Sequence, residues 1–184
     1  MKCCARQFNL YLPLLAVLAL LALCCGCQSG KKDKEPTAAL RIHIEASDSL
    51  ADTGQTVTGQ TVSVLRADPV LVSIAADPVL TEANVIGAAV LSVQGGYAVQ
   101  VKLDQTGAWT LEQFSAANPG KHFVIYGQWG EKATDGRWLA APLISHRMTD
   151  GIVSFTPDAS RAETDKLVLG LNNVAKKNLK ALLK

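Results

Sequence analysis

Side chains that could perform covalent or metal chemistry are few in this chain of 184 residues. All five cysteines lie among the first 27 residues, at positions 3, 4, 24, 25 and 27. Disulfides, thiolate metal sites and cysteine nucleophiles are therefore excluded for the rest of the chain. The histidines, His43, His122 and His146, show no HxxxH or HxH spacing. A metal site would need ligands that only the fold brings together, and we expect none.

Motifs of the common catalytic and nucleotide-binding sites are also absent from the sequence, including the nucleophile elbow, the phosphate-binding loop and the dinucleotide fingerprint. Ser145 and His146 are adjacent. However, neighbouring residues on a strand point to opposite faces, so their adjacency does not predict a catalytic pair. Asp104 is better explained as a helix cap than as half of an acid pair with Asp150 or Asp158. The sequence thus predicts no catalytic residue and no cofactor.

Tryptophans are the remaining candidates for a recognition surface, because aromatic side chains concentrate where proteins bind partners. Trp129 and Trp138 flank the polar loop 130–137, and they would lie near each other if the flanking strands pair as a hairpin. Together with Arg137 they are the candidate partner-binding residues for a protein or peptide. The alternative is a loop base sealed by two indoles. Trp109 is expected at the periphery of the core.

These residues would be positioned by many short strands. In the first of them, Leu40, Ile42 and Ile44 alternate with polar residues, which predicts a strand buried on one face. Gln94-Gly95-Gly96 predicts a hairpin turn between two longer strands. Strands are predicted at residues 40–46, 62–65, 70–75, 85–93, 97–103, 122–129, 138–145 and 152–155.

Two amphipathic helices interrupt the strands. The first is predicted over residues 105–117, started by Asp104 or Thr106. The second is predicted to open at Thr156-Pro157-Asp158, which supplies a cap, a proline at the first position and an acid in the first turn. Runs of strands broken by two helices predict an α+β domain, with a mainly antiparallel sheet and both helices packed on one side.

The start of the chain has the three-part layout of a secretory signal. Lys2 and Arg6 form a basic beginning, and an apolar run from Leu10 to Leu23 follows. The run contains Pro13 and is shorter than the roughly 20 apolar residues that a membrane span needs. We therefore expect a removable signal, with an uncleaved signal anchor as the alternative.

Gly26 followed by Cys27 resembles the lipobox of bacterial lipoproteins, in which a small residue precedes the cysteine that receives lipid. The third position before Cys27, commonly Leu in that family, is Cys24 here. The resemblance implies that residues 1–26 are a signal peptide, that Cys27 is acylated, and that this lipid anchor holds the domain at a membrane of the cell envelope. Gln28 stands where an inner-membrane retention Asp would, which favours the outer membrane facing the periplasm.

The rest of the chain divides into a tether, one domain and a tail. Residues 27–38 are polar and predict a flexible tether, and residues 39–176 suit one domain with its own core. Residues 177–184 include three lysines and predict a basic tail that touches anionic lipid or a partner. The alternative is that they are the frayed continuation of a helix. Without Lys2 and Arg6, 16 basic residues balance 16 acidic ones, so charge gives no argument for nucleic acid as a partner.

Several short motifs lie between Tyr97 and Asn173. They are Val101-Lys102-Leu103-Asp104, Gly107, Phe114, Asn118, Gly120-Lys121, Ile125, Ala141-Pro142, Ile144, Gly151, Val153, Phe155-Thr156 and Ala162. In this order and spacing they resemble the head subdomain of the first periplasmic domain of SecD and SecDF, membrane components that assist protein translocation. The resemblance implies an α+β head and a non-enzymatic module that contacts polypeptides.

Departures from that family bear on mechanism. No hydrophobic span follows the leader, so proton-driven pulling by this chain alone is excluded. The loop 130–137 replaces a shorter Asp-Gly type of turn. The sequence therefore predicts a non-catalytic, SecD-head-like envelope lipoprotein that contacts protein or peptide partners, in translocation or as a repurposed adaptor. The alternative is a small periplasmic enzyme or ligand-binding lipoprotein whose polar groups converge only in three dimensions.

Overall fold

The computed structural model describes residues 35–46, 59–130 and 135–182. The strands in these ranges are β1 (Ala38–Ile44), β2 (Gly59–Val64), β3 (Val70–Ala75), β4 (Leu80–Thr81), β5 (Val85–Val93), β6 (Gly96–Leu103), β7 (Phe123–Trp129), β8 (Asp135–Ala140) and β9 (Ile152–Phe155). The helices are the short 3₁₀ helix η2 (Glu82–Asn84), α2 (Gln105–Ala117) and α3 (Arg161–Leu182).

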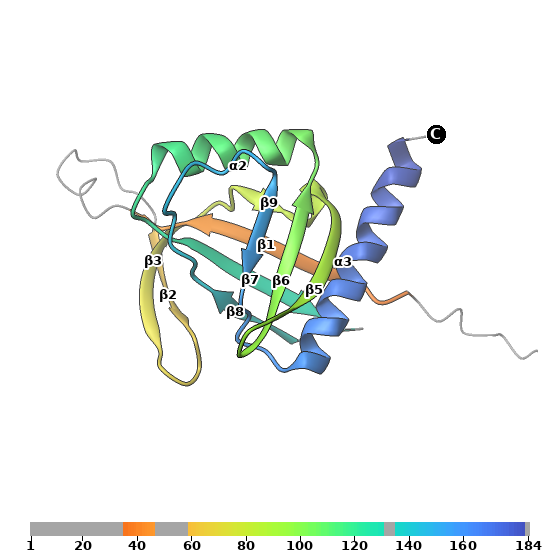
Figure 1. Cartoon of the computed structure of the whole chain (residues 1–184), viewed down its shortest axis with the longest axis horizontal. Coiled ribbons are helices and arrows are strands. Elements are labelled where there is room, and N and C mark those ends of the chain that lie inside the picture. The colour runs from red at the N-terminus through yellow and green to blue at the C-terminus, as the bar shows by residue number, and fades with distance from the viewer. Residues whose placement is uncertain (1–34, 47–58, 131–134, 183–184) are drawn as a thin grey trace, which may run out of the picture. The chain divides into compact units, whose positions relative to one another are not determined.

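The strands form two larger sheets and a separate hairpin (Figure 1). One sheet has the order β4-β1-β7-β8, the other has the order β5-β6-β9, and β2 pairs with β3. Every strand pairing in the described residues is antiparallel. The predicted α+β class with mainly antiparallel strands is therefore confirmed.

The main core lies where the two larger sheets face each other, with α2 and α3 packed around them. Leu40 and Ile42 of β1 enter it from one sheet, and Val99 and Val101 of β6 enter it from the other. All four are at most 1% exposed. Because full burial of such a side chain contributes about 1.5–3 kcal/mol, this alternating pattern holds the sheets together.

The β2–β3 hairpin covers part of the outer face of the first sheet. Its apolar residues form a second cluster with Val124 of β7. This cover explains why His43, on the polar side of the β1 alternation, is only 6% exposed. Its Nδ1 lies 2.9 Å from the carbonyl oxygen of Ala75. The expectation that β1 is buried on one face only is therefore wrong at His43, because a distant hairpin closes over it.

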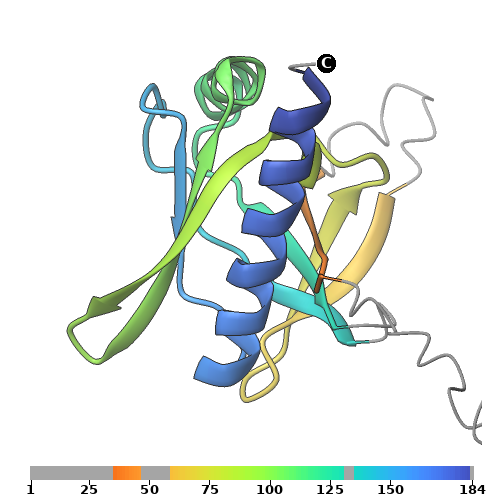
Figure 2. The ribbon, with the colours of Figure 1, turned by 90° about the vertical axis from the view of Figure 1, so that its right-hand side faces the viewer.

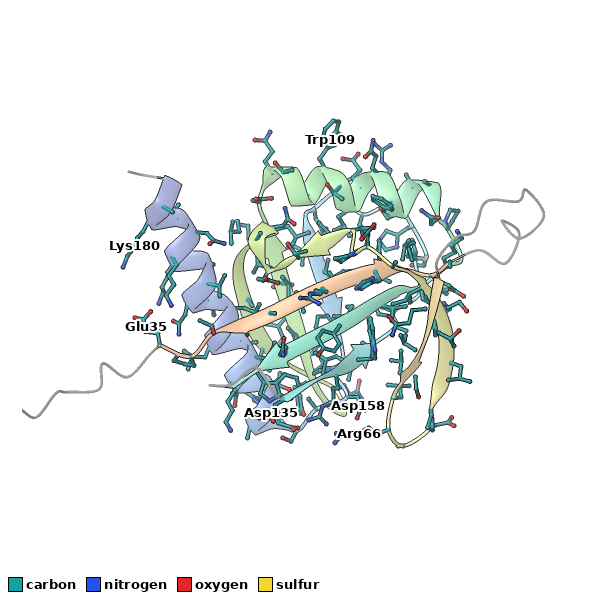
Figure 3. The ribbon with its side chains drawn as sticks, turned by 180° about the vertical axis from the view of Figure 1, so that it is seen from behind. Glu35, Arg66, Trp109, Asp135, Asp158 and Lys180 are labelled. Atoms are coloured by element: carbon teal, nitrogen blue, oxygen red, sulfur yellow. The ribbon has the colours of Figure 1, made fainter. Side chains whose placement is uncertain are left out.

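Helix α2 has the bounds that the sequence predicts. Asp104 is its N-cap, and its Oδ1 accepts a hydrogen bond of 2.6 Å from the backbone N–H of Gly107. Leu111 is fully buried beneath the helix. Trp109, in contrast, is 67% exposed and projects away from the domain (Figure 3). The expectation that Trp109 belongs to the core periphery is wrong.

Helix α3 begins at Arg161, later than the sequence predicts. Its first turn is closed by Ser160 and Glu163: Ser160 Oγ accepts from the Glu163 N–H at 3.3 Å, and Glu163 Oε2 accepts from the Ser160 N–H at 2.7 Å. This reciprocal capping box replaces the predicted start at residues 156–158. The helix then continues without a break to Leu182, so the first residues of the predicted tail are helical.

Candidate functional site

The hairpin of β7 and β8 carries the predicted recognition residues. Tyr126 is paired with Trp138, Gly127 with Arg137, and Trp129 with Asp135. Successive residues of a strand alternate between the two faces of a sheet. Trp138 therefore shares a face with Tyr126, whereas Trp129 lies on the opposite face with Arg137.

The expectation that the two indoles lie near each other is thus wrong, although their strands do pair as predicted. Trp129 belongs to the main core and is 2% exposed, while Trp138 packs against the second cluster. The physical reason is the odd offset between them across the ladder, which sends the rings to opposite sides of the sheet.

Arg137 lies over Trp129 and connects β8 to α3. Its guanidinium carbon is 5.0 Å from the centroid of the Trp129 ring, and one guanidinium nitrogen forms an ion pair with Glu163. The pKa of Glu163 is held below its ordinary value, chiefly by the hydrogen bond from the Ser160 backbone N–H, and the Arg137 charge adds to this effect. Arg137 is therefore fixed by a carboxylate and a ring face, which limits it to one orientation.

Beside Trp138, on the outer face of the sheet, lies an open groove of about 600 Å³. It separates β8 from the turn that joins β2 to β3. We call it the Trp138 groove; its lining residues are Ser63, Leu65, Arg66, Pro69, Tyr126, Gly136, Arg137, Trp138 and Asp158.

The floor of the Trp138 groove is aromatic. The ring of Trp138 meets Tyr126 at a centroid distance of 5.2 Å and an interplanar angle of 65°. It also meets His43, which is buried and does not line the groove, at 5.4 Å and 69°. Edge-to-face pairs of this kind are worth about 0.5–1.5 kcal/mol each beyond their burial, so the indole is held in place. Any Cβ at Gly136 would overlap the Tyr126 hydroxyl, so only glycine allows this ring to lie across the strand.

One wall of the groove is an ion pair between residues distant in sequence. Arg66 Nε lies 3.1 Å from Asp158 Oδ2, and the Arg66 backbone N–H donates to the same oxygen at 2.8 Å (Figure 3). The hydrogen bond to Asp158 raises the pKa of Arg66. Leu65, just before it, has a φ of 68°, a left-handed conformation that is strained for a bulky residue. Asp158 thus holds, through both the backbone and the side chain of Arg66, the residue that follows this strained position.

Taken together, these contacts give a rigid apolar floor and a rim of charges that are already paired. Both arginines of the groove have a carboxylate partner, so the site offers no uncompensated charge to a small anion. Among the residues that the structure describes, neither a nucleophile with a base nor a set of metal ligands lines it. The groove is suited to apolar or aromatic side chains of a polypeptide rather than to bond-breaking chemistry.

The histidines form separate pairs. His122 Nδ1 lies 2.7 Å from Glu45 Oε2, and His146 Nδ1 lies 2.9 Å from Ser145 Oγ. The second pair contradicts our expectation that these adjacent side chains point apart, because β8 ends at Ala140 and this segment is not a strand. Both residues of that pair are exposed.

A second hollow contains Ser145, His146 and Asp150. Asp150 Oδ1 accepts a hydrogen bond of 3.1 Å from the Ile152 N–H, and no carboxylate in the described ranges bonds to His146. A serine and a histidine without an orienting acid do not make up a catalytic triad. Groups of three potential metal ligands are likewise absent from the part of the chain that the structure describes.

Cys27, the predicted lipidation site, lies outside the described residues, as does most of the predicted tether. None of the described helices is long and apolar enough to cross a membrane.

Comparison with known proteins gives a consistent result. The family model of the SecDF P1 head subdomain matches residues 55–175. A structure of SecDF, described as a membrane component that enhances protein export, aligns over 75% of this chain and 63% of its own length, with 20% identity and a TM-score of 0.50. SecDF in its super-membrane-facing form aligns over 75% of this chain and 19% of its own length, with 21% identity and a TM-score of 0.51. No curated protein matches the chain.

Proposed function

The chain belongs to the SecDF P1 head subdomain family, and on that premise we propose that it is a non-catalytic module of the cell envelope that contacts protein or peptide segments through the Trp138 groove. The carrying observation is the aromatic floor of Trp138 and Tyr126, which lines an open groove beside the Arg66–Asp158 ion pair and is backed by the buried His43. One structural relative is described as enhancing protein export. This chain spans less than two thirds of that relative, so a role in export belongs to the proposal.

An apolar peptide side chain would gain from the groove in two ways. Covering the half-buried Trp138 ring removes apolar area from water, at roughly 25 cal/mol per Å². Because that ring is already immobilised by its two aromatic neighbours, little side-chain entropy is lost on binding. We therefore expect segments with aromatic or large aliphatic residues to bind more tightly than polar ones.

Attachment to a membrane completes the proposal. Acylation of Cys27 would tether the domain at the cell envelope, with the outer membrane facing the periplasm favoured over the inner membrane. Metabolic labelling with a fatty-acid analogue should mark the wild-type chain and should be lost in Cys27→Ser, while Cys24→Ser keeps the label. Labelling retained in Cys27→Ser would refute the lipidation site.

Groove binding is tested by titrating the full chain, held in detergent micelles, with an unstructured fluorescent peptide that contains phenylalanine and leucine. Trp138→Ala should weaken binding about 30-fold, since truncating a buried aromatic anchor costs about 2 kcal/mol or more. Trp109→Ala is the matched control, because it removes an equally large but exposed indole from α2. Equal affinities of wild type and Trp138→Ala, or equal losses in both variants, would contradict the proposed function.

A further inference from the structure

The hairpin of β5 and β6 has one edge without a neighbouring strand. β5 lies at the end of its sheet, and the hairpin projects beyond α3 (Figure 2). Along β5, the large side chains of Leu91 and Val93 are 40% and 46% exposed. An exposed strand edge carries a row of N–H and C=O groups that can pair with another chain.

Asn172 of α3 already occupies one position of this edge. Its side-chain oxygen accepts from the Ala88 N–H at 2.9 Å, and its side-chain nitrogen donates to the Ala88 carbonyl at 2.9 Å. An amide side chain that bonds both groups of one residue reproduces what a neighbouring antiparallel strand would do. The contact therefore shows that the N–H and C=O of Ala88 point away from β6.

The same direction is expected every second residue along the strand. The register with β6 is regular from Gly87 to Val93, so Val90 and Ser92 also point their backbone groups toward the open edge. No hydrogen bond in the described residues joins either of them to an element outside the hairpin. Ala88 is thus the closed position of the edge, and Val90 and Ser92 are the open ones.

The hairpin end is held firmly. The Tyr97 hydroxyl, on the strand opposite Ser92, donates to the carbonyl oxygen of Ala159. The Arg161 guanidinium lies 5.6 Å from the Tyr97 ring centroid. The open edge is therefore presented in one orientation, which lowers the entropic cost of docking a strand on it.

We propose that the open edge of β5, at Val90 and Ser92, docks an extended polypeptide segment as an added antiparallel strand. Leu91 and Val93 lie on one face, so the docked segment would carry apolar residues at alternate positions on that face and polar ones between them. A second copy of the chain fits less well. The open stretch from Val90 to Ser92 is only about 10 Å long. A strip that short along one strand buries far less surface than the roughly 800 Å² per partner that a stable dimer buries. This surface is separate from the Trp138 groove, and the inference does not rest on the proposed function.

The test uses a seven-residue peptide of alternating valine and threonine, capped by lysines, added to the full chain in detergent micelles. Backbone amide exchange of Val90 and Ser92 should slow at least tenfold on binding. Ser92→Pro removes one outward N–H and should weaken binding about tenfold, because an edge strand tolerates proline but loses that bond. Ser92→Ala keeps the N–H and should bind as the wild type does.

A second measurement leaves the protein unaltered. The same peptide N-methylated at its threonines keeps every side chain but loses the donors that would face β5, so it should bind at least tenfold more weakly. Equal binding of the two peptides, or unchanged exchange at Val90 and Ser92, would overturn the proposal. It would also be overturned if the chain formed dimers that Ser92→Pro converts to monomers. Because the exchange measurement reads the amides of Val90 and Ser92 alone, a negative result here is distinguishable from a negative result in the titration of the Trp138 groove.

Discussion

At Gly170, α3 lies tightly against the start of β1. A Cβ added at Gly170 would lie 2.7 Å from both the Cβ and the backbone nitrogen of Ala38, and 2.8 Å from the carbonyl carbon of Thr37. Two of these three atoms belong to the backbone and cannot rotate away. Gly170→Ala therefore forces the helix and the strand apart, an overpacking that costs about 1–3 kcal/mol.

Helix propensity acts in the opposite direction in Gly170→Ala. Alanine favours the helical state by about 1 kcal/mol relative to glycine. Since the close contacts involve backbone on both sides, we take the upper part of the overpacking range and expect a net loss of about 1–2 kcal/mol in the free energy of unfolding. Propensity alone predicts a gain, so the sign of the change decides between the two effects.

Urea unfolding of the full chain, followed by tryptophan fluorescence, to which the buried Trp129 contributes, measures this difference. Gly87→Ala in β5 is the control, because a Cβ there meets nothing within 4 Å. It should leave stability unchanged or raise it slightly. A Gly170→Ala variant at least as stable as the wild type would refute the packing of α3 on β1 described above.

Two further predictions concern the ends of the helices. Asp104→Ala should lower stability by about 1 kcal/mol in urea unfolding, because the Gly107 N–H loses its acceptor, whereas Asp104→Asn should restore most of it; equal losses would exclude a capping role. Glu163→Gln should be less stable than the wild type at pH 7. Because the folded-state pKa of Glu163 is lowered, its contribution is present above the unfolded pKa of about 4.5 and is lost as the pH falls through the folded value. The difference between the two proteins should therefore shrink below about pH 4.5, and a difference independent of pH would argue against the charge of Glu163 as its source.

Local signals predicted local structure well. The bounds of α2 follow from Asp104 before the helix and Asn118-Pro119-Gly120 after it, and both act within a few residues. The start of α3 was mispredicted because residues 156–158 satisfy the same local rules as Ser160 and Glu163. What separates the two candidates is tertiary, since Asp158 is engaged by Arg66, 92 residues away. The sequence around Asp158 therefore gives no sign of its contact with Arg66.

The recognition site shows a different limit of sequence reasoning. Pairing of the strands that carry Trp129 and Trp138 was predictable, but the register was not, because a shift of one residue moves a side chain to the other face. Only the register reveals that Trp138 and not Trp129 lies on the groove side. Tyr126 and His43 were also missed as neighbours of Trp138. Both residues alternate with core residues along their strands. That alternation places them on the side of the sheet away from the main core, but it does not identify them as neighbours of Trp138.

Helix α3 links the two surfaces to the rest of the fold, and this gives a way to separate stability from binding. Glu163 at its beginning bonds Arg137 of the groove, Gly170 packs on β1, and Asn172 closes β5 at Ala88. Gly170 and Asn172 are only about 3 Å apart along the axis, so a helix displaced by Gly170→Ala should also loosen the Asn172 bonds. Exchange of the Ala88 amide should then quicken more than global unfolding accounts for, while the pairing of Tyr126 with Trp138, set by the β7–β8 register, stays intact. If the Ala88 amide instead exchanges only by global unfolding, α3 does not move as a unit, and edge and groove are held independently.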